Sequence, residues 1–132
     1  CYIFSIRAGK GTLPWYVGKA AKQTFRKECI QPHKLVKYNR ILDQKRGTPL
    51  LYLVARMTPN GRYSKISKST KGYADVDFLE RFFIGMSLNR NRYLLNDQDT
   101  KMYSQINVPG ILNSHGKITK AAGGLKSVLG IR

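Results

Sequence analysis

The chain has 132 residues, of which 42% are hydrophobic and 11% aromatic, a composition typical of one globular domain and not of a disordered tail. It carries 24 Lys and Arg against 7 Asp and Glu, and this net charge of +17 favours a polyanionic partner, above all nucleic acid. No apolar run approaches the ~18 residues of a membrane helix, and the first residues lack the basic start and long apolar core of a signal peptide. We therefore expect a cytoplasmic protein, nucleoid- or nucleus-associated forms included, rather than a secreted or transmembrane one.

The basic residues are spread along the whole chain instead of forming one amphipathic helix, which favours nucleic acid over an anionic membrane surface. Cys1 and Cys29 form no C-x-x-C pair, and the only histidines are His33 and His115, which argues against zinc-finger chemistry. A reduced compartment fits these cysteines, although their number leaves a single disulfide open. Because the chain starts at Cys1 and not at Met, we expect a preceding segment or an additional domain.

The N-terminal residues predict a β-hairpin with a long loop. Tyr2–Ile6 is apolar and aromatic, as strands often are, and Ala8–Thr12 is rich in turn residues. Leu13–Gly18 is then expected to return as the second strand, with Pro14 tolerated near its start.

Two helical segments are expected after the hairpin. The first covers Ala20–Glu28 and ends before Pro32. The second runs from Pro32 to Gln44, and its apolar residues recur at helical spacing: Leu35, Tyr38, Ile41 and Leu42.

An apolar stretch and a basic stretch follow. Pro49–Arg56 is a continuous apolar run of strand length, which predicts a central strand covered on both faces. Thr58–Gly61 is a turn signal. Arg62–Lys71 is serine-rich and basic, and we expect an exposed edge strand or loop whose cations contact phosphates without reading bases, namely Arg62, Lys65, Lys68 and Lys71.

The clearest helix is Asp75–Leu88, with an expected apolar stripe of Val76, Leu79, Phe82, Phe83 and Met86. The remainder is less regular and ends in a possible helix over Lys117–Leu129, weakened by two glycines. The order β-β-α-α-β-α predicts a small α/β (α+β) sandwich with a central three-stranded, mainly antiparallel sheet flanked by helices. We expect one domain over residues 1–132, with a core in residues 1–100 and a tail of unassigned role.

Four short segments resemble the motifs of the GIY-YIG nucleases, in the order in which that family carries them. Cys1–Phe4 resembles the first name motif without its glycine, and Tyr16–Gly18, followed by Lys19-Ala20, resembles the second. Phe78–Ile84 resembles the helix that presents a metal-binding glutamate, and Leu94–Asn96 resembles the closing asparagine. The resemblance covers most of the first 96 residues.

This resemblance implies an endonuclease that hydrolyses phosphodiester bonds, with DNA favoured over RNA and with Mg²⁺ or Mn²⁺ as cofactor. Glu80 would bind the metal, since hard divalent cations take carboxylate oxygen. Tyr2 and Tyr16 would face each other across the hairpin, one acting on the attacking water and the other placing the phosphate or the water network. Arg26, ten positions after Tyr16, would steady the phosphate, and Asn96 would orient a phosphate or the Glu80 region.

Other cations could share the task of Arg26, because phosphoryl transfer needs positive charge near the reacting group. Lys19, His33 and Arg40 are the alternatives, and His33 could also act as a general base. We expect Lys19, Lys22 and Arg40 to contribute to nucleic-acid binding together with the basic stretch.

Each of these residues also has an ordinary structural interpretation. Asp77-x-x-Glu80 has the form of a helix capping box, and tyrosines are common in strands. Asn96 fits a turn, and Arg26 and His33 fit a solvated surface. The alternative function is accordingly a non-catalytic nucleic-acid-binding module, which would need no divalent metal. A double-strand cut by a single-site enzyme would favour a homodimer.

Overall fold

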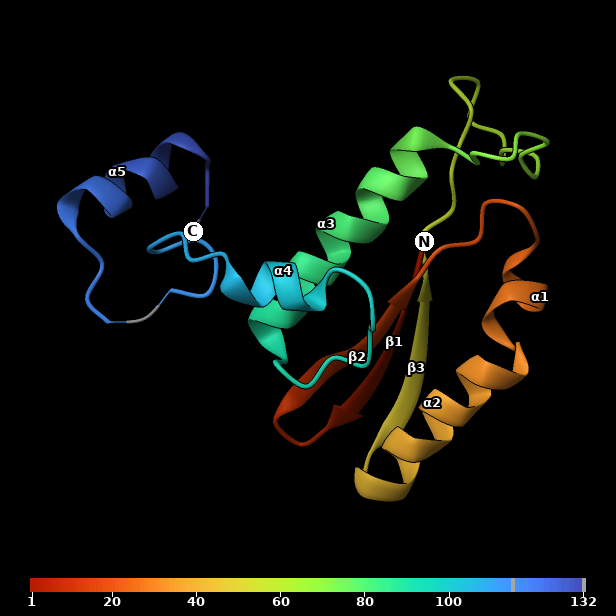
Figure 1. The fold of residues 1–132 in the computed structure, drawn as a ribbon, viewed down its shortest axis with the longest axis horizontal. Helices are drawn as coiled ribbons and strands as arrows, with labels where there is room; N and C mark the ends of the chain where they lie inside the picture. The colour runs from red at the N-terminus through yellow and green to blue at the C-terminus, as the bar shows by residue number, and fades with distance from the viewer. Residues whose placement is uncertain (115, 132) are drawn as a thin grey trace.

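The structure, a computed structural model, describes residues 1–114 and 116–131, so His115 lies outside the described part. Within these residues, three strands and five helices follow one another (Figure 1). They are β1 (Tyr2–Ala8), β2 (Gly11–Gly18), α1 (Phe25–Cys29), α2 (Pro32–Gln44), β3 (Thr48–Leu53), α3 (Ala74–Arg90), α4 (Thr100–Gln105) and α5 (Lys120–Val128). The expected α+β fold with a three-stranded antiparallel sheet is confirmed.

The sheet has the order β2-β1-β3, and β1 pairs antiparallel with both neighbours. The hairpin is tighter than expected, since Ala8 pairs with Gly11 and only two residues connect the strands. Gly11 has a φ of +110°, a backbone conformation that glycine adopts without steric cost. Pro14 is accommodated because β2 is an outer strand.

A β-bulge in β2 changes which side chains share a face. The register shifts between Phe4 and Ser5, which oppose Tyr16 and Pro14, so Trp15 is the extra residue. Neighbours in a regular strand point to opposite faces, but Trp15 and Tyr16 both pack against the same core cluster. The bulge therefore brings Tyr16 to the side of the sheet that α2 covers.

Two hydrophobic cores lie on the two faces of the sheet, and α2 and α3 flank the strands in Figure 1. Phe4, Ile6 and Trp15 pack against Tyr38 and Ile41 of α2. On the other face, the core consists of Val17 from β2, Ile84 and Leu88 from α3, and Leu94. The helix α5 lies away from the sheet (Figure 1).

The expectation of a central, doubly covered strand at Pro49–Arg56 is wrong. This run forms the edge strand β3, and β1 is central. The side chain of Leu53 is 52% exposed, and Leu51 and Tyr52 are also exposed. The reason is that α3 packs against β2, while β3 lies at the edge of the sheet. The apolar residues of this run favour a strand, but at this position the strand is less buried than a central one.

The helix predictions hold for α2, whose bounds are confirmed, and in part elsewhere. Of Ala20–Glu28, only the part from Phe25 onward is helical, because Thr24 is the N-cap and accepts a hydrogen bond from the backbone of Lys27. The short α4 was not expected, and the C-terminal helix is shorter than predicted. No helix in the described part has the length and apolarity to cross a membrane.

The helix α3 is confirmed, its predicted stripe is confirmed in part, since Val76 is buried and Phe83 packs against the core, and its predicted capping box is wrong. Val76 is buried, whereas Phe82 and Met86 are exposed, because the buried side of the helix runs through Val76, Ile84 and Leu88 instead. Tyr73 is the N-cap and makes no side-chain capping bond, so Asp77-x-x-Glu80 lies inside the helix and forms no capping box.

The segment after α3 closes the free edge of β2 through two asparagine side chains. Asn96 Oδ1 accepts from Val17 N at 2.9 Å, and Asn96 Nδ2 donates to the Val17 carbonyl at 2.7 Å. Asn91 Nδ2 donates to the Pro14 carbonyl at 2.7 Å, and Leu95 N donates to the Trp15 carbonyl. Asn96 thus acts on the strand backbone as a neighbouring strand would, and its amide is not directed at a phosphate or at Glu80 as we expected.

Replacing Asn96 should therefore cost stability. Asn96→Ala leaves the Val17 N–H and carbonyl without their partner, and we expect a loss of about 1–3 kcal/mol in the free energy of unfolding. Urea unfolding measures it, with Asn39→Ala on the exposed side of α2 as control, which should stay within about 0.5 kcal/mol of the parent. Equal stability of the two variants would contradict the proposed role of Asn96.

Candidate active site at the end of the hairpin

A pocket of about 410 Å³ lies where the end of β2, the α1–α2 region, the loop before α3 and the first two turns of α3 meet. Its walls are strongly polar. Acidic and basic side chains and one tyrosine line it: Tyr16, Lys19, Lys22, Glu28, Lys34, Lys71, Asp77 and Glu80. The structure therefore brings five of the expected site residues together, namely Tyr16, Lys19, Lys22, Lys71 and Glu80.

Two carboxylates of α3 converge on one cation. Asp77 and Glu80 are three residues apart and so lie on the same side of the helix. Lys19, directly after β2, places its Nζ 2.8 Å from Asp77 Oδ1 and 3.0 Å from Glu80 Oε2. Burial alone would lower the pKa of Lys19, but its hydrogen bonds to the two carboxylates outweigh this and raise it.

This arrangement fits a hard divalent cation. Two carboxylates that already hold one ammonium between them present the oxygen ligands that Mg²⁺ takes, with water and phosphate completing the coordination. Within residues 1–114 and 116–131, no group of three or more His, Cys, Asp and Glu is arranged to hold a metal, so protein ligands would supply only part of the coordination. Asp77 joins Glu80 here, although sequence reasoning assigned it only to a helix cap.

The hairpin tyrosines occupy different depths. Tyr2 opposes Gly18 and Tyr16 opposes Phe4, so the two tyrosines are diagonal neighbours with ring centroids 6.2 Å apart. Tyr2 is fully buried, whereas Tyr16 is half-buried and borders the pocket. Tyr16 is thus the tyrosine in position to meet a substrate, and Tyr2 lies behind it.

Burial raises the pKa of Tyr2 and of Tyr16, and the negative charge of Glu80 raises that of Tyr16 further. Both phenols therefore stay neutral well above neutral pH, and a phenolate base is disfavoured unless positive charge enters the pocket. The hydroxyls of Tyr2 and Tyr38 are buried without a hydrogen-bond partner among the described residues.

Gly18 is required by its closeness to Tyr2. A Cβ at Gly18 would lie 2.3 Å from Tyr2 Cζ and 2.4 Å from the Tyr2 hydroxyl oxygen, well inside van der Waals contact. Gly18 therefore has a steric function, since it leaves room for the phenol of Tyr2.

Lys34 and Glu28 form an ion pair that sequence reasoning missed. Lys34 is buried on α2, is paired with Glu28, and lies 5.3 Å from the ring centroid of Tyr2. Burial lowers the pKa of Lys34, while the charge of nearby Glu80 acts in the opposite direction. The available signal was spacing, because Lys34 precedes the buried Tyr38 by four residues and so shares its helix face.

The three residues considered for phosphate or general-base roles besides Lys19 lie elsewhere. Arg26 is exposed and does not line the pocket, because the five-residue helix α1 buries Cys29 instead. His33 is exposed in the first turn of α2, and Arg40 is exposed near Trp15 and Leu95. The arrangement does not support the role predicted for Arg26. The cations beside the tyrosines are Lys34, at the ring of Tyr2, and Lys37, at the ring of Tyr16.

The basic stretch is a loop, as one of the two expectations had it. Arg62, Lys65 and Lys68 are exposed on it outside the pocket, and Lys71 reaches the pocket wall.

Both cysteines are free thiols and buried.

Comparison with known proteins adds no assignment. No protein-family model, curated protein or solved structure matches the chain.

The contact between Gly18 and Tyr2 can be tested by one methyl group. Gly18→Ala should lower the free energy of unfolding by about 1–3 kcal/mol, because the fully buried Tyr2 ring must move to admit the new Cβ. Gly9→Ala is the matched control, since a Cβ there meets nothing within 4 Å. Thermal or urea unfolding compares the two, and a Gly18→Ala protein as stable as the Gly9→Ala protein would contradict the steric role.

Proposed function

We propose that the protein is a divalent-metal-dependent nuclease that hydrolyses phosphodiester bonds in nucleic acid, with DNA as the favoured substrate. One observation carries the proposal. Tyr16, the acidic pair of Asp77 and Glu80, and the cations Lys19 and Lys34 meet around one polar pocket at the end of the hairpin. The resemblance of the hairpin and of α3 to GIY-YIG motifs supports the same function.

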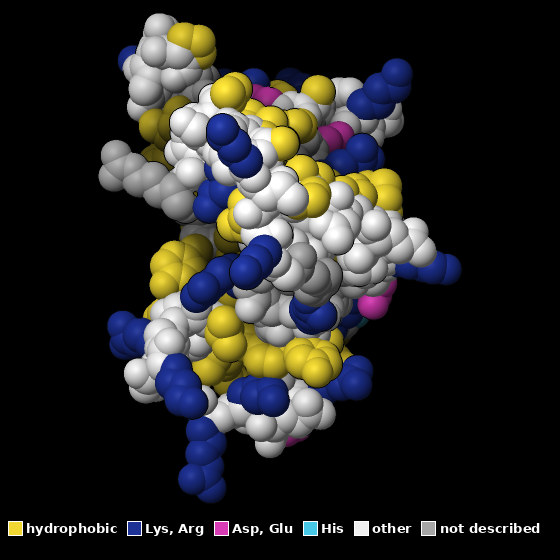
Figure 2. Space-filling model, turned by 90° about the vertical axis from the view of Figure 1, so that its left-hand side faces the viewer, with side chains coloured by type: hydrophobic (Ala, Val, Ile, Leu, Met, Phe, Trp, Pro, Cys, Tyr) yellow, Lys and Arg dark blue, Asp and Glu magenta, His cyan; other side chains and the backbone are white. Residues whose placement is uncertain are grey.

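The charge of the molecule supports a nucleic-acid substrate. A net charge of +17 attracts phosphate backbones from any direction, and Figure 2 shows Lys and Arg side chains scattered over one whole face with few acidic ones among them. Acidic residues are scarce in this chain, yet three of its seven Asp and Glu line the pocket: Glu28, Asp77 and Glu80. These carboxylates gather at one pocket although the chain as a whole is strongly basic, which indicates that the pocket requires carboxylate oxygen.

Each side chain then has a definite task. Asp77 and Glu80 would hold Mg²⁺ or Mn²⁺, which when bound supplies positive charge to the phosphate oxygens and acidifies water. Lys22 and Lys71 are exposed and line the pocket, where they would bind phosphate oxygens. Lys34, deeper in the wall, holds positive charge next to the tyrosines.

Tyr16 orients the attacking water as a neutral hydroxyl. Its pKa is raised first by burial and then by Glu80, so at neutral pH its hydroxyl keeps its proton and can donate it in a hydrogen bond. The ring of Tyr2 lies behind that of Tyr16, with ring centroids 6.2 Å apart, and so supports this wall of the pocket.

The alternative is a binding module without catalysis, and the ion pairs within the pocket favour it. Lys19 pairs with both Asp77 and Glu80, and Lys34 pairs with Glu28, so each of these carboxylates has an ammonium partner without a metal. Such a module would bind nucleic acid in a salt-dependent manner and leave it intact.

Cleavage of supercoiled plasmid with Mg²⁺ or Mn²⁺ distinguishes the two functions. We expect cutting by the parent and a loss of at least about 100-fold in Glu80→Gln, because one group that organises charge at the reacting phosphate is removed. Asp75→Asn is the control, since Asp75 lies on the same helix but pairs with Arg56 outside the pocket.

The binding of the variants completes this test. Glu80→Gln should bind DNA at least as well as the parent in EDTA, because it removes a negative charge. Undiminished cutting by Glu80→Gln would contradict the site, and tight binding without any cutting by the parent would establish the binding module instead.

A further inference from the structure

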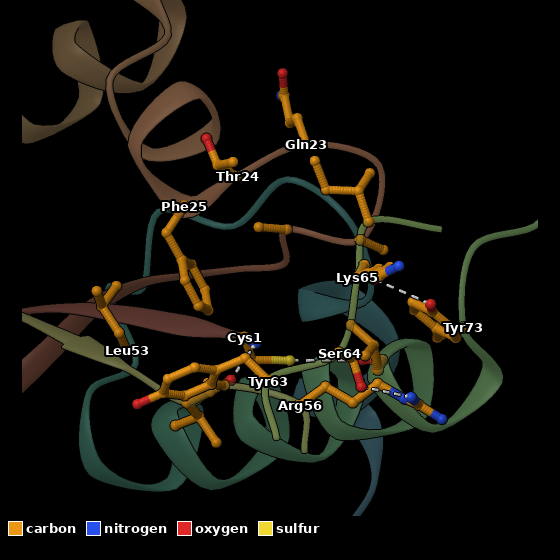
Figure 3. A pocket seen from close by; sticks show the side chains of 16 residues that line it. Cys1, Gln23, Thr24, Phe25, Leu53, Arg56, Tyr63, Ser64, Lys65 and Tyr73 are labelled. Carbon is orange, nitrogen blue, oxygen red and sulfur yellow. Dashed lines mark hydrogen bonds between the residues drawn. The ribbon is translucent and has the colours of Figure 1, made fainter. Parts of the chain in front are cut away.

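The structure has a second pocket, of about 470 Å³, which is shown in Figure 3. Its wall is largely apolar. Phe25 of α1 points into it, Leu53 borders it at the end of β3, and Tyr63 lies across from Phe25. Ala21 lines both this pocket and the candidate active site, so the two are neighbours.

Tyr63 is an exposed aromatic side chain on a backbone that is fixed in place. Tyr63 is 76% exposed and lines this pocket, so its ring is accessible to a ligand. Its backbone forms an antiparallel bridge with Met57, and Ser64 N donates to the Arg56 carbonyl at 2.9 Å. The same loop is fastened to the active-site side, because Ser67 N donates to the Ala21 carbonyl at 2.8 Å.

The rim of this pocket is positively charged. Between Arg56 and Lys71 the chain has five basic residues and no acidic one. Lys65 lines the aromatic pocket and Lys71 lines the candidate active site, so the loop carries cations from one to the other. Arg56 lies 4.2 Å from the ring centroid of Tyr73, which anchors the loop on the start of α3.

We propose that this aromatic pocket binds an unpaired nucleobase of the strand whose backbone crosses the candidate active site. Aromatic rings on two sides suit the flat face of a base, and the basic loop suits the phosphates on either side of it. A base inside a duplex is stacked and must be flipped out before it can enter such a pocket. The preferred substrate therefore has a single-stranded segment next to the phosphate that is cut.

This inference rests on the nucleic-acid-binding half of the proposed function and not on catalysis. It is tested without cleavage, in EDTA, by the binding of oligonucleotides that carry the fluorescent base 2-aminopurine. We expect the parent to bind the single strand more tightly than the matching blunt duplex and to quench 2-aminopurine in the single strand.

The decisive variant is Tyr63→Ala. Loss of one stacking partner should weaken single-strand binding by about 5- to 100-fold and abolish the quenching, while duplex binding stays nearly unchanged. Tyr63→Phe keeps the ring and should behave as the parent does. Tyr93→Ala is the matched control, since Tyr93 is 79% exposed and lies outside this pocket.

Two results would overturn the inference at different levels. If Tyr63→Ala leaves single-strand binding intact, or weakens single-strand and duplex binding equally, the base pocket is wrong while the proposed nuclease stands. If the parent binds neither form, the proposed function fails as well.

Discussion

The candidate active site depends on a tyrosine packed against a glycine. Tyr2 starts the central strand, is fully buried, and fits only because Gly18 opposite it has no side chain. Around Tyr2 meet Tyr16 from β2 and Lys34 from α2, so one buried ring sets the distance between hairpin and helix. The bulge at Trp15 completes this constraint, because it turns Tyr16 to the face on which Tyr2 and Tyr38 lie.

In this arrangement, acidic and basic side chains meet in the pocket. Lys19 joins the end of β2 to the first two turns of α3, and Lys34 joins α2 to α1 through Glu28. Lys19 and its partners are partly exposed, so these ion pairs contribute little to stability. In the proposed function, a bound metal and a phosphate would rearrange these carboxylate and ammonium groups.

The sequence predicted those parts of the fold that depend on local pattern. The hairpin, α2 and α3 follow from alternation and helical spacing, and the bounds of α2 were correct. The position of β3 was not predictable in this way, because an apolar run such as Leu50–Leu53 has the same pattern at an edge as in the centre. Which strand is central depends on where α3 packs, a contact between distant parts of the chain.

The candidate site, like the fold, was predictable from the sequence only in part. Tyr16, Lys19 and Glu80 were predicted from short motifs and do meet in one pocket. Asp77 was misassigned because the true start of α3 lies earlier, at Ala74. Lys34 was missed because a buried lysine is rare and its partner Glu28 comes from a neighbouring segment, and Asn96 proved to hold the backbone of Val17.

The central claim is that Asp77 and Glu80 form a divalent-cation site whose place Lys19 takes when no metal is bound. Titration with Mn²⁺, followed by electron paramagnetic resonance without nucleic acid, tests it directly. The account predicts Mn²⁺ binding by the parent, severalfold tighter binding by Lys19→Met, which removes the competing ammonium, and loss of binding by Glu80→Gln. Mn²⁺ binding that is absent from the parent and from Lys19→Met, or that is unchanged by Glu80→Gln, would contradict it.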